Sequence, residues 1–341
     1  MNQRNGSIDV FRFLGACLVF LCHSIYSEYR PTLSLLGVLG RWVVPFFFMV
    51  AGYYFQKSYA VRPVQAFTKT IRNLLFVTLF VNLFYLLFTL LTEGTIKPLI
   101  TYFTLLTGVY FHLWFLTSMM LGYLALWFLL HFKLDKLLPF VVVVSLLIIL
   151  IFIPYNSLLG LGPHPIYARS LLSVPFLCIG FLISKHALDR HVSRLTAYIL
   201  IALGIGLQLV EVSFLSSFMP SAAKVNFLAG TLPLSVGIFL LSLRLSISPE
   251  YPLSYYGRRY SLPLYLYHPV VNLVFHRIFA KSIVTGGFFH LMSPLIGLGI
   301  CMLLMVVLDK YAPAVFRALC GDFSRPKVSV EEKSARVSST Q

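Results

Sequence analysis

The chain has 341 residues, of which 58% are hydrophobic and only 11% are charged. Soluble proteins carry about 25% charged residues, so this composition excludes an ordinary water-soluble domain. The formal net charge of +16 would suit nucleic acid, but the lysines and arginines cluster at alternate ends of the apolar stretches. Because this is the bias of the positive-inside rule, we predict a lipid-embedded protein with no nucleic-acid partner.

Apolar stretches long enough to cross a bilayer, roughly 17–25 residues each, recur along the chain. We predict an all-α, polytopic helical bundle of about ten transmembrane helices, with both termini cytoplasmic. Residues 1–318 would form the membrane domain, and the polar residues 319–341 a disordered tail. The predicted spans are 8–29, 35–56, 72–92, 111–131, 138–153, 168–184, 195–214, 227–244, 262–281 and 290–309.

The first predicted span contains two ionisable side chains, Arg12 and His23. At 3.6 residues and 5.4 Å per turn, a helix places both on one face, roughly 16 Å apart along its axis. Ionisable residues inside a membrane are costly and tend to be functional. Arg12 then marks an anion site at the cytoplasmic mouth, and His23 a deep proton-transfer group. The alternatives are a snorkelling anchor for Arg12 and an interhelical hydrogen bond for His23.

The later spans add candidates that have equally plain structural explanations. Lys69 and Arg72 can simply be positive-inside anchors, and Glu211, an acidic residue well inside the seventh span, can make an interhelical hydrogen bond. Residues 99–130 are too long for one upright span, so we predict a re-entrant or interfacial lead-in over 99–111. The five cysteines show no paired spacing, so we predict no disulfide framework, no metal site and no permanently bound cofactor.

The stretch "IDVFRFLGACLVFLCHS" (8–24) places ten residues between an arginine and a histidine. This pattern is similar to the opening helix of the membrane-bound acyltransferase 3 family, and further segments, in order, resemble that family too. "RWVVPFFFMVAGYYF" (41–55) resembles its second helix, although Ala51 replaces the usual serine. The third helix matches less well, because Val77 stands near an expected proline. Further matching segments are "HLWFLTSMMLGYL" (112–124), "RSLLSVPFLCIGFLISKH" (169–186) and "YSLPLYLYHPVV" (260–271).

The resemblance implies a multi-pass O-acetyltransferase of the bacterial cytoplasmic membrane. It would move an acyl group, usually acetyl, from cytosolic acyl-CoA to a hydroxyl of an envelope carbohydrate or lipid-linked sugar. Arg12, Lys69 and Arg72 would hold the CoA phosphates through charge-assisted hydrogen bonds. His23 would act as a general base or as a covalent acyl carrier, and Glu211 would orient it or bind a sugar hydroxyl.

The other candidates have two open interpretations each. Arg41 and Arg169 would contact the acceptor or the thioester oxygen, or anchor span ends. His112 and Trp114 would form an acceptor platform or belong to an aromatic belt. His268 would take part in catalysis or in helix packing.

Two rival functions have different signatures. A transporter or flippase for an envelope glycan or lipid-linked precursor would show repeated halves with broken helices. A membrane sensor or scaffold would need neither an anion mouth nor a deep histidine.

Overall fold

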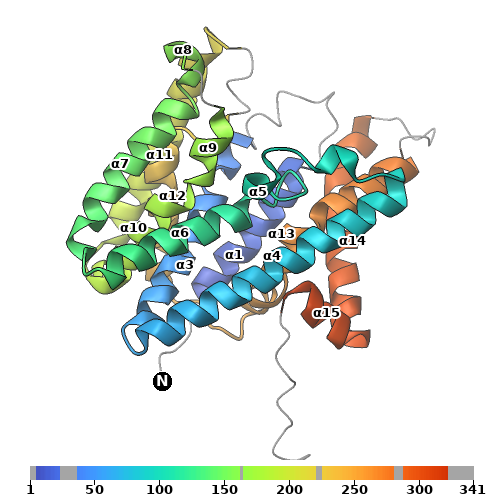
Figure 1. Ribbon diagram of the computed structural model, residues 1–341, viewed down its shortest axis with the longest axis horizontal. Coiled ribbons are helices and arrows are strands. Elements are labelled where there is room, and N and C mark those ends of the chain that lie inside the picture. The colour runs from blue at the N-terminus through green and yellow to red at the C-terminus, as the bar shows by residue number, and fades with distance from the viewer. Residues whose placement is uncertain (1–4, 24–36, 162–163, 220–224, 280–286, 322–341) are drawn as a thin grey trace, which may run out of the picture.

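The computed structural model describes residues 5–23, 37–161, 164–219, 225–279 and 287–321, and all regular elements within these ranges are helices (Figure 1). Eight helices in these ranges are long and apolar enough to cross a membrane. The predicted all-α, polytopic membrane fold is therefore confirmed. Most of the predicted disordered tail, from residue 322 on, lies outside the described residues.

The long helices are α1 (Gly6–His23), α3 (Val43–Tyr59), α4 (Pro63–Glu93), α6 (Trp114–His131), α7 (Leu138–Phe152), α10 (Ser173–Lys185), α11 (Arg194–Ser216), α12 (Thr231–Arg244), α13 (Pro252–Phe279) and α14 (Gly287–Tyr311). The shorter ones are η1 (Lys97–Leu99), α5 (Thr104–Thr107), η2 (Asp135–Leu137), α8 (Asn156–Leu159), α9 (Pro165–Ser170), η3 (Leu188–Arg190) and α15 (Pro313–Leu319). Among the long helices, α12 is apolar but short, and α13 falls outside the eight candidates. The count of about ten crossings stays a prediction.

Two helices begin well before their predicted spans. The helix α4 starts at Pro63 rather than residue 72, and α13 starts at Pro252 rather than residue 262. Proline suits the first position of a helix because its fixed φ matches and its missing N–H would be unpaired there. Hydropathy missed these first turns because they are polar. As a result Lys69 and Arg72 lie inside α4 and not in a loop before it.

Helices α1 and α13 pack in parallel and in a fixed register. The hydroxyl of Ser254 donates to the carbonyl of Gly6 at 3.0 Å, and Phe20 lies against His268, with ring centres 6.2 Å apart. Between these contacts, a Cβ at Gly257 would stand 1.7 Å from the carbonyl oxygen of Asp9. Only glycine permits this approach, so it fixes which turns of α1 face which turns of α13.

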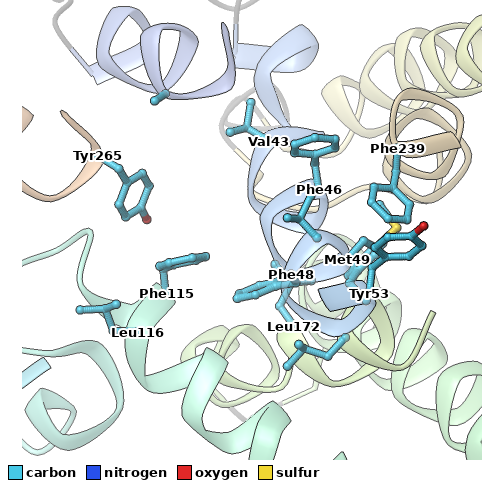
Figure 2. Close-up of a cluster of buried hydrophobic side chains, with 14 of the residues drawn as sticks. Val43, Phe46, Phe48, Met49, Tyr53, Phe115, Leu116, Leu172, Phe239 and Tyr265 are labelled. Atoms are coloured by element: carbon cyan, nitrogen blue, oxygen red, sulfur yellow. The ribbon is translucent and has the colours of Figure 1, made fainter. Parts of the chain in front are cut away.

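The packed core lies around α3, between α1 and α10. Phe46, Phe48 and Met49 are fully buried, and Phe48 stacks on Phe115 of α6 with ring centres 5.0 Å apart (Figure 2). Without water to drive association, membrane helices gain stability from such close packing. In Figure 1, α1 and α3 lie between a group containing α7, α10 and α11 and a group containing α13 and α14.

The predicted lead-in before α6 consists of η1, α5 and a turn at Gly108, which has φ +72°. Side chains satisfy its irregular backbone: Val109 donates its N–H to Asn82 Oδ1 of α4 at 2.8 Å, and Thr104 Oγ1 donates to the Leu99 carbonyl at 2.9 Å. The predicted break between the lead-in and α6 is confirmed. Its depth in the membrane stays a prediction.

Candidate functional site

A cavity of about 400 Å³ opens between α1, α3, α4, α6 and α13. Arg12, Ser58 and Thr70 line it where α3 ends and α4 begins, on the side predicted to be cytoplasmic. Its size is in the usual range for small-molecule sites. The remaining lining is mostly aliphatic and aromatic, and consists of Phe47, Val50, Ala51, Tyr54, Phe55, Leu74, Val77, Phe115, Leu116, Met119, Tyr123, Ser261, Leu262 and Tyr265.

Phe115 and Tyr265 belong both to this lining and to the aromatic core. Their ring centres lie 5.0 Å apart, and Figure 2 shows Phe115 between Tyr265 and Phe48. Phe47 approaches both rings edge-on, with centres 6.3 Å and 6.4 Å away. The Tyr265 hydroxyl in turn donates to the backbone carbonyl of His112 at 3.2 Å. Tyr265 therefore joins the cavity to a cluster of histidines.

This histidine cluster consists of His23, His112 and His268. The ring centre of His268 lies 5.0 Å from that of His23 and 5.3 Å from that of His112. His112 and His268 are fully enclosed, whereas His23 is exposed at the end of α1. The structure thus brings three predicted site residues together from α1, from the turn before α6 and from α13. The described residues hold no group of three or more His, Cys, Asp or Glu ligands arranged for a metal ion.

Backbone carbonyls fix the tautomer of each histidine. His23 Nδ1 lies 2.9 Å from the Val19 carbonyl, His112 Nε2 lies 2.9 Å from the Leu266 carbonyl, and His268 Nδ1 lies 2.7 Å from the Tyr265 carbonyl. Because a carbonyl oxygen can only accept, these ring nitrogens must be the donors. When the rings are neutral, the lone pairs therefore sit on His23 Nε2, His112 Nδ1 and His268 Nε2.

Two of these lone pairs are buried and unpartnered. His112 Nδ1 and His268 Nε2 make no hydrogen bond within the part of the chain that the structure describes. Leaving a buried polar atom unsatisfied costs about 1–3 kcal/mol. Such atoms are rare in proteins, and they occur at sites that hold a proton, a water molecule or a substrate.

Pro269 explains why the His268 side chain can hydrogen-bond to a backbone carbonyl of its own helix. A proline has no N–H, so the carbonyl four residues earlier, that of Tyr265, loses its usual helical donor. His268 Nδ1 supplies the replacement. The next carbonyl of α13, that of Leu266, accepts from both His112 Nε2 and the Tyr85 hydroxyl, the latter at 2.7 Å. Two neighbouring carbonyls of α13 therefore hold two of the three imidazoles, and the proline accounts for the one that holds His268.

Arg12 forms an ion pair with Asp9, with Nη1 3.2 Å from Oδ1. Asp9 is almost completely buried, whereas 24% of the Arg12 side chain is exposed. The pair holds the guanidinium against the cavity wall and leaves part of it accessible. Arg12 borders the cavity shared with Tyr265 of α13, and His23 touches His268 of α13, so both predicted residues face this helix.

Lys69 and Arg72 are exposed on α4 and do not line the cavity. The lining residues of this helix, Thr70, Leu74 and Val77, follow the spacing of one helix face. Arg72 lies two residues from both Thr70 and Leu74, so it projects from the opposite side of α4. Contact of these two cations with donor phosphates has to occur outside the cavity and stays a prediction.

Glu211 lies in a second polar group. Within the described residues, its hydrogen bonds go to Tyr155, Ala229 and Gly230, and not to His23. Its carboxylate accepts from the Tyr155 hydroxyl at 2.7 Å and from the backbone N–H groups of Ala229 and Gly230 at 2.8 Å and 3.4 Å. Burial and this carboxylate raise the pKa of Tyr155, so its phenol stays a donor at neutral pH. Glu211 thus stabilises the start of α12, where a negative charge is favourable. These contacts give Glu211 the structural role that was the alternative interpretation, and its predicted catalytic role stays a prediction.

The two outer arginines have different surroundings. Arg41 is buried and donates to the Val225 carbonyl at 2.8 Å and to Gln208 Oε1 at 3.3 Å, which ties it to the polar group of Glu211. Arg169 of α9 lies over the Trp114 ring at 5.1 Å and is near Tyr265. Trp114 therefore supports Arg169, and its predicted acceptor platform with His112 stays a prediction.

Comparison with known proteins places this site in a family. The model of the acyltransferase 3 family, described as an acyltransferase domain, matches residues 5–308. The chain therefore belongs to this family of membrane acyltransferases, as the sequence resemblance predicted. Its transmembrane helices make it a multi-pass membrane protein.

One curated relative is the serine/alanine racemase of Enterococcus gallinarum, which is 30% identical over 294 residues. The match covers 78% of this chain but 41% of the relative, so the chain spans about two fifths of that protein. No solved structure matches the chain.

Sequence reasoning missed Tyr265, Tyr85 and Pro269 as parts of the site. Tyrosines are frequent in this chain, with 19 in all, so residue type alone does not single out two of them. Pro269 did carry a signal, because a proline within a long apolar helix frees a carbonyl one turn earlier. A histidine directly before it marks a side chain able to use that carbonyl.

Proposed function

We propose that this protein is an O-acyltransferase that moves an acetyl group from cytosolic acetyl-CoA to a hydroxyl of a cell-envelope carbohydrate, in the bacterial cytoplasmic membrane. The observation that carries the proposal is the connection of two chemically different regions through Tyr265. On one side lies a cavity bordered by the cation Arg12, and on the other lies a cluster of three imidazoles.

The cavity suits the donor. Arg12 is the cation at its rim and would bind a phosphate of CoA, while the long apolar lining would take the pantetheine arm. The thioester would then lie near Tyr265, where Arg169 is the adjacent cation. A positive charge there would stabilise the negative oxygen that develops when the thioester carbonyl is attacked.

The histidine cluster suits the acceptor. His23 is the exposed member, and its Nε2, which does not take part in the bond to the Val19 carbonyl, would accept the proton of an acceptor hydroxyl. The acceptor oxygen then bonds to the acetyl carbon, the carbon–sulfur bond breaks, and the proton ends on the CoA sulfur. Since only neutral imidazole accepts a proton, the rate should rise with pH through the pKa of His23.

The test uses protein purified in nanodiscs with radiolabelled acetyl-CoA and a panel of envelope glycans. His23→Asn is the informative variant, because the asparagine amide can still donate to the Val19 carbonyl but cannot accept a proton. We expect transfer to fall by about 10²–10⁴-fold while CoA binding is retained. Transfer at a near-native rate would refute His23 as the base.

Two further measurements separate the competing functions. A labelled acetyl group trapped on the native protein, at a position lost in the His23 variant, would replace the general base by a covalent acyl carrier. Failure of the native protein to acetylate any glycan, together with glycan movement across the membrane, would favour a transporter.

A further inference from the structure

The two buried lone pairs of the histidine cluster have no assigned task in the reaction proposed above. His23 alone is exposed to an incoming acceptor, while His112 Nδ1 and His268 Nε2 are enclosed and unpartnered within the described residues. Three neutral imidazoles whose free nitrogens are all acceptors cannot hydrogen-bond to one another through those atoms. One added proton would let two of these nitrogens hydrogen-bond to each other.

The surroundings favour a proton that is shared and then released. His268 faces His23 from α1 and His112 from the turn before α6, and Tyr265 of its own helix lies 6.1 Å away between ring centres. Tyr85 of α4 also packs here, with its ring 5.2 Å from that of His112, and Phe111 packs against both His23 and His112. Within the part of the chain that the structure describes, the hydrogen bonds of the three imidazoles go to backbone carbonyls and none goes to a carboxylate that would trap the proton permanently.

We propose that His268 relays the acceptor's proton: it receives the proton from His23 and passes it to the donor's sulfur. The inference rests on the proposed acetyl transfer. In each cycle the acceptor O–H bond breaks and its proton passes to His23 Nε2 and then to His268 Nε2. When the carbon–sulfur bond breaks, its electron pair leaves with sulfur, which takes this proton. Every imidazole ends neutral and no redox change occurs.

The placement of the rings explains why passing the proton from His23 to His268 would help the reaction. A proton left on His23 would be lost to outer water, because His23 is exposed. His268 is completely buried and sits one helical turn from Tyr265, which borders the donor cavity. Passing the proton inward therefore keeps it on the side where the thiolate forms.

The first test is His268→Asn in nanodiscs, because asparagine can keep the hydrogen bond to the Tyr265 carbonyl and yet cannot take up a proton. We expect kcat to fall at least tenfold, with KM for acetyl-CoA within twofold of the native value. The matched control is His131→Asn at the end of α6, where the histidine stacks on Trp127 outside the cluster, and its kcat should be unchanged. Native kcat in folded His268→Asn would overturn the relay.

The second test distinguishes proton transfer from packing. His268→Ala leaves a space the size of an imidazole, and added imidazoles of increasing basicity should restore kcat in proportion to that basicity. Rescue that is independent of basicity would show that His268 only fills space, and would overturn the proposal.

A measurement on the native protein remains decisive if both variants fail to fold. With ¹⁵N-labelled histidine, magnetic resonance should show His268 protonated at Nδ1 and bare at Nε2 in the resting state. Protonation at Nε2 instead would exclude the relay.

The outcomes also separate this inference from the proposed function. If native protein transfers acetyl, His23→Asn does not, and His268→Asn works normally, the base stands and only the relay fails. If His23→Asn retains transfer, the proposed function fails first.

Discussion

Arg12→Ala tests whether the cavity binds the charged end of CoA. Arg12 is the cation at the rim of the cavity, and part of its side chain is accessible. Losing a charge-assisted hydrogen bond costs about 1.5–3 kcal/mol. Since about 1.4 kcal/mol corresponds to a factor of ten, we expect CoA to bind roughly 10- to 150-fold more weakly.

The ion pair with Asp9 has to be separated from this effect. In Arg12→Ala the buried carboxylate of Asp9 loses this partner and would repel a phosphate nearby, which exaggerates the loss. The double variant Arg12→Ala with Asp9→Asn removes that repulsion. If Arg12 binds phosphate directly, the double variant should still bind CoA at least about tenfold more weakly than Asp9→Asn alone.

Arg62→Ala is the matched control, because it removes the same charge from an exposed position at the start of α4 that does not line the cavity. An exposed cation is screened by salt, so we expect a change of no more than a few-fold that disappears at high ionic strength. Calorimetric titration of nanodisc protein with CoA, and with pantetheine, which has no phosphate, provides the readout. Unchanged CoA affinity in Arg12→Ala, or an equal loss for pantetheine, would refute the assignment of the cavity.

Three further predictions concern the fold. Gly257→Ala should destabilise the protein by about 1–3 kcal/mol or more in thermal unfolding, because its Cβ would meet the Asp9 carbonyl oxygen, whereas Gly206→Ala, which has open space, should be neutral or stabilising. Tyr155→Phe removes a hydrogen bond to Glu211, so it should lower stability by about 1 kcal/mol and leave acetyl transfer intact; lost transfer in stable protein would return Glu211 to the site. In intact cells, a cysteine at position 188 should resist external labelling, and a labelled one would reverse the predicted topology and donor side.

The sequence predicts the class of fold and one face of the site. A bilayer admits only helices with internally satisfied backbones or closed barrels, so long apolar stretches identify most of the membrane helices. Helical periodicity likewise puts Arg12 and His23 on one face of α1, and both indeed face α13. These predictions succeed because each depends only on the residues of one helix and on the bilayer around it.

The rest depends on contacts between distant segments. His112 reaches the Leu266 carbonyl across 154 residues, and no local pattern shows that these two meet. The sequence suggested that Glu211 could orient His23, because hydropathy gives an approximate depth in the membrane and says nothing about which helices are adjacent. Its neighbours are Tyr155 and the start of α12, which need that carboxylate for their hydrogen bonds.

The parallel pairing of α1 with α13 explains why the spacing between arginine and histidine is tied to this fold. A shift by one residue would bring the Cβ of Arg258 or Tyr256 against the Asp9 carbonyl, where only Gly257 fits. The glycine therefore sets Arg12 level with the turn of α13 that lines the cavity, and sets His23 level with His268. Pro269 then frees the carbonyl that holds the ring of His268. A spacing shorter by one helical turn would move the imidazole about 5.4 Å back along α1, to the level of Phe20. In the proposed reaction, the separation between the arginine and the histidine is therefore tied to the register that Gly257 sets between α1 and α13.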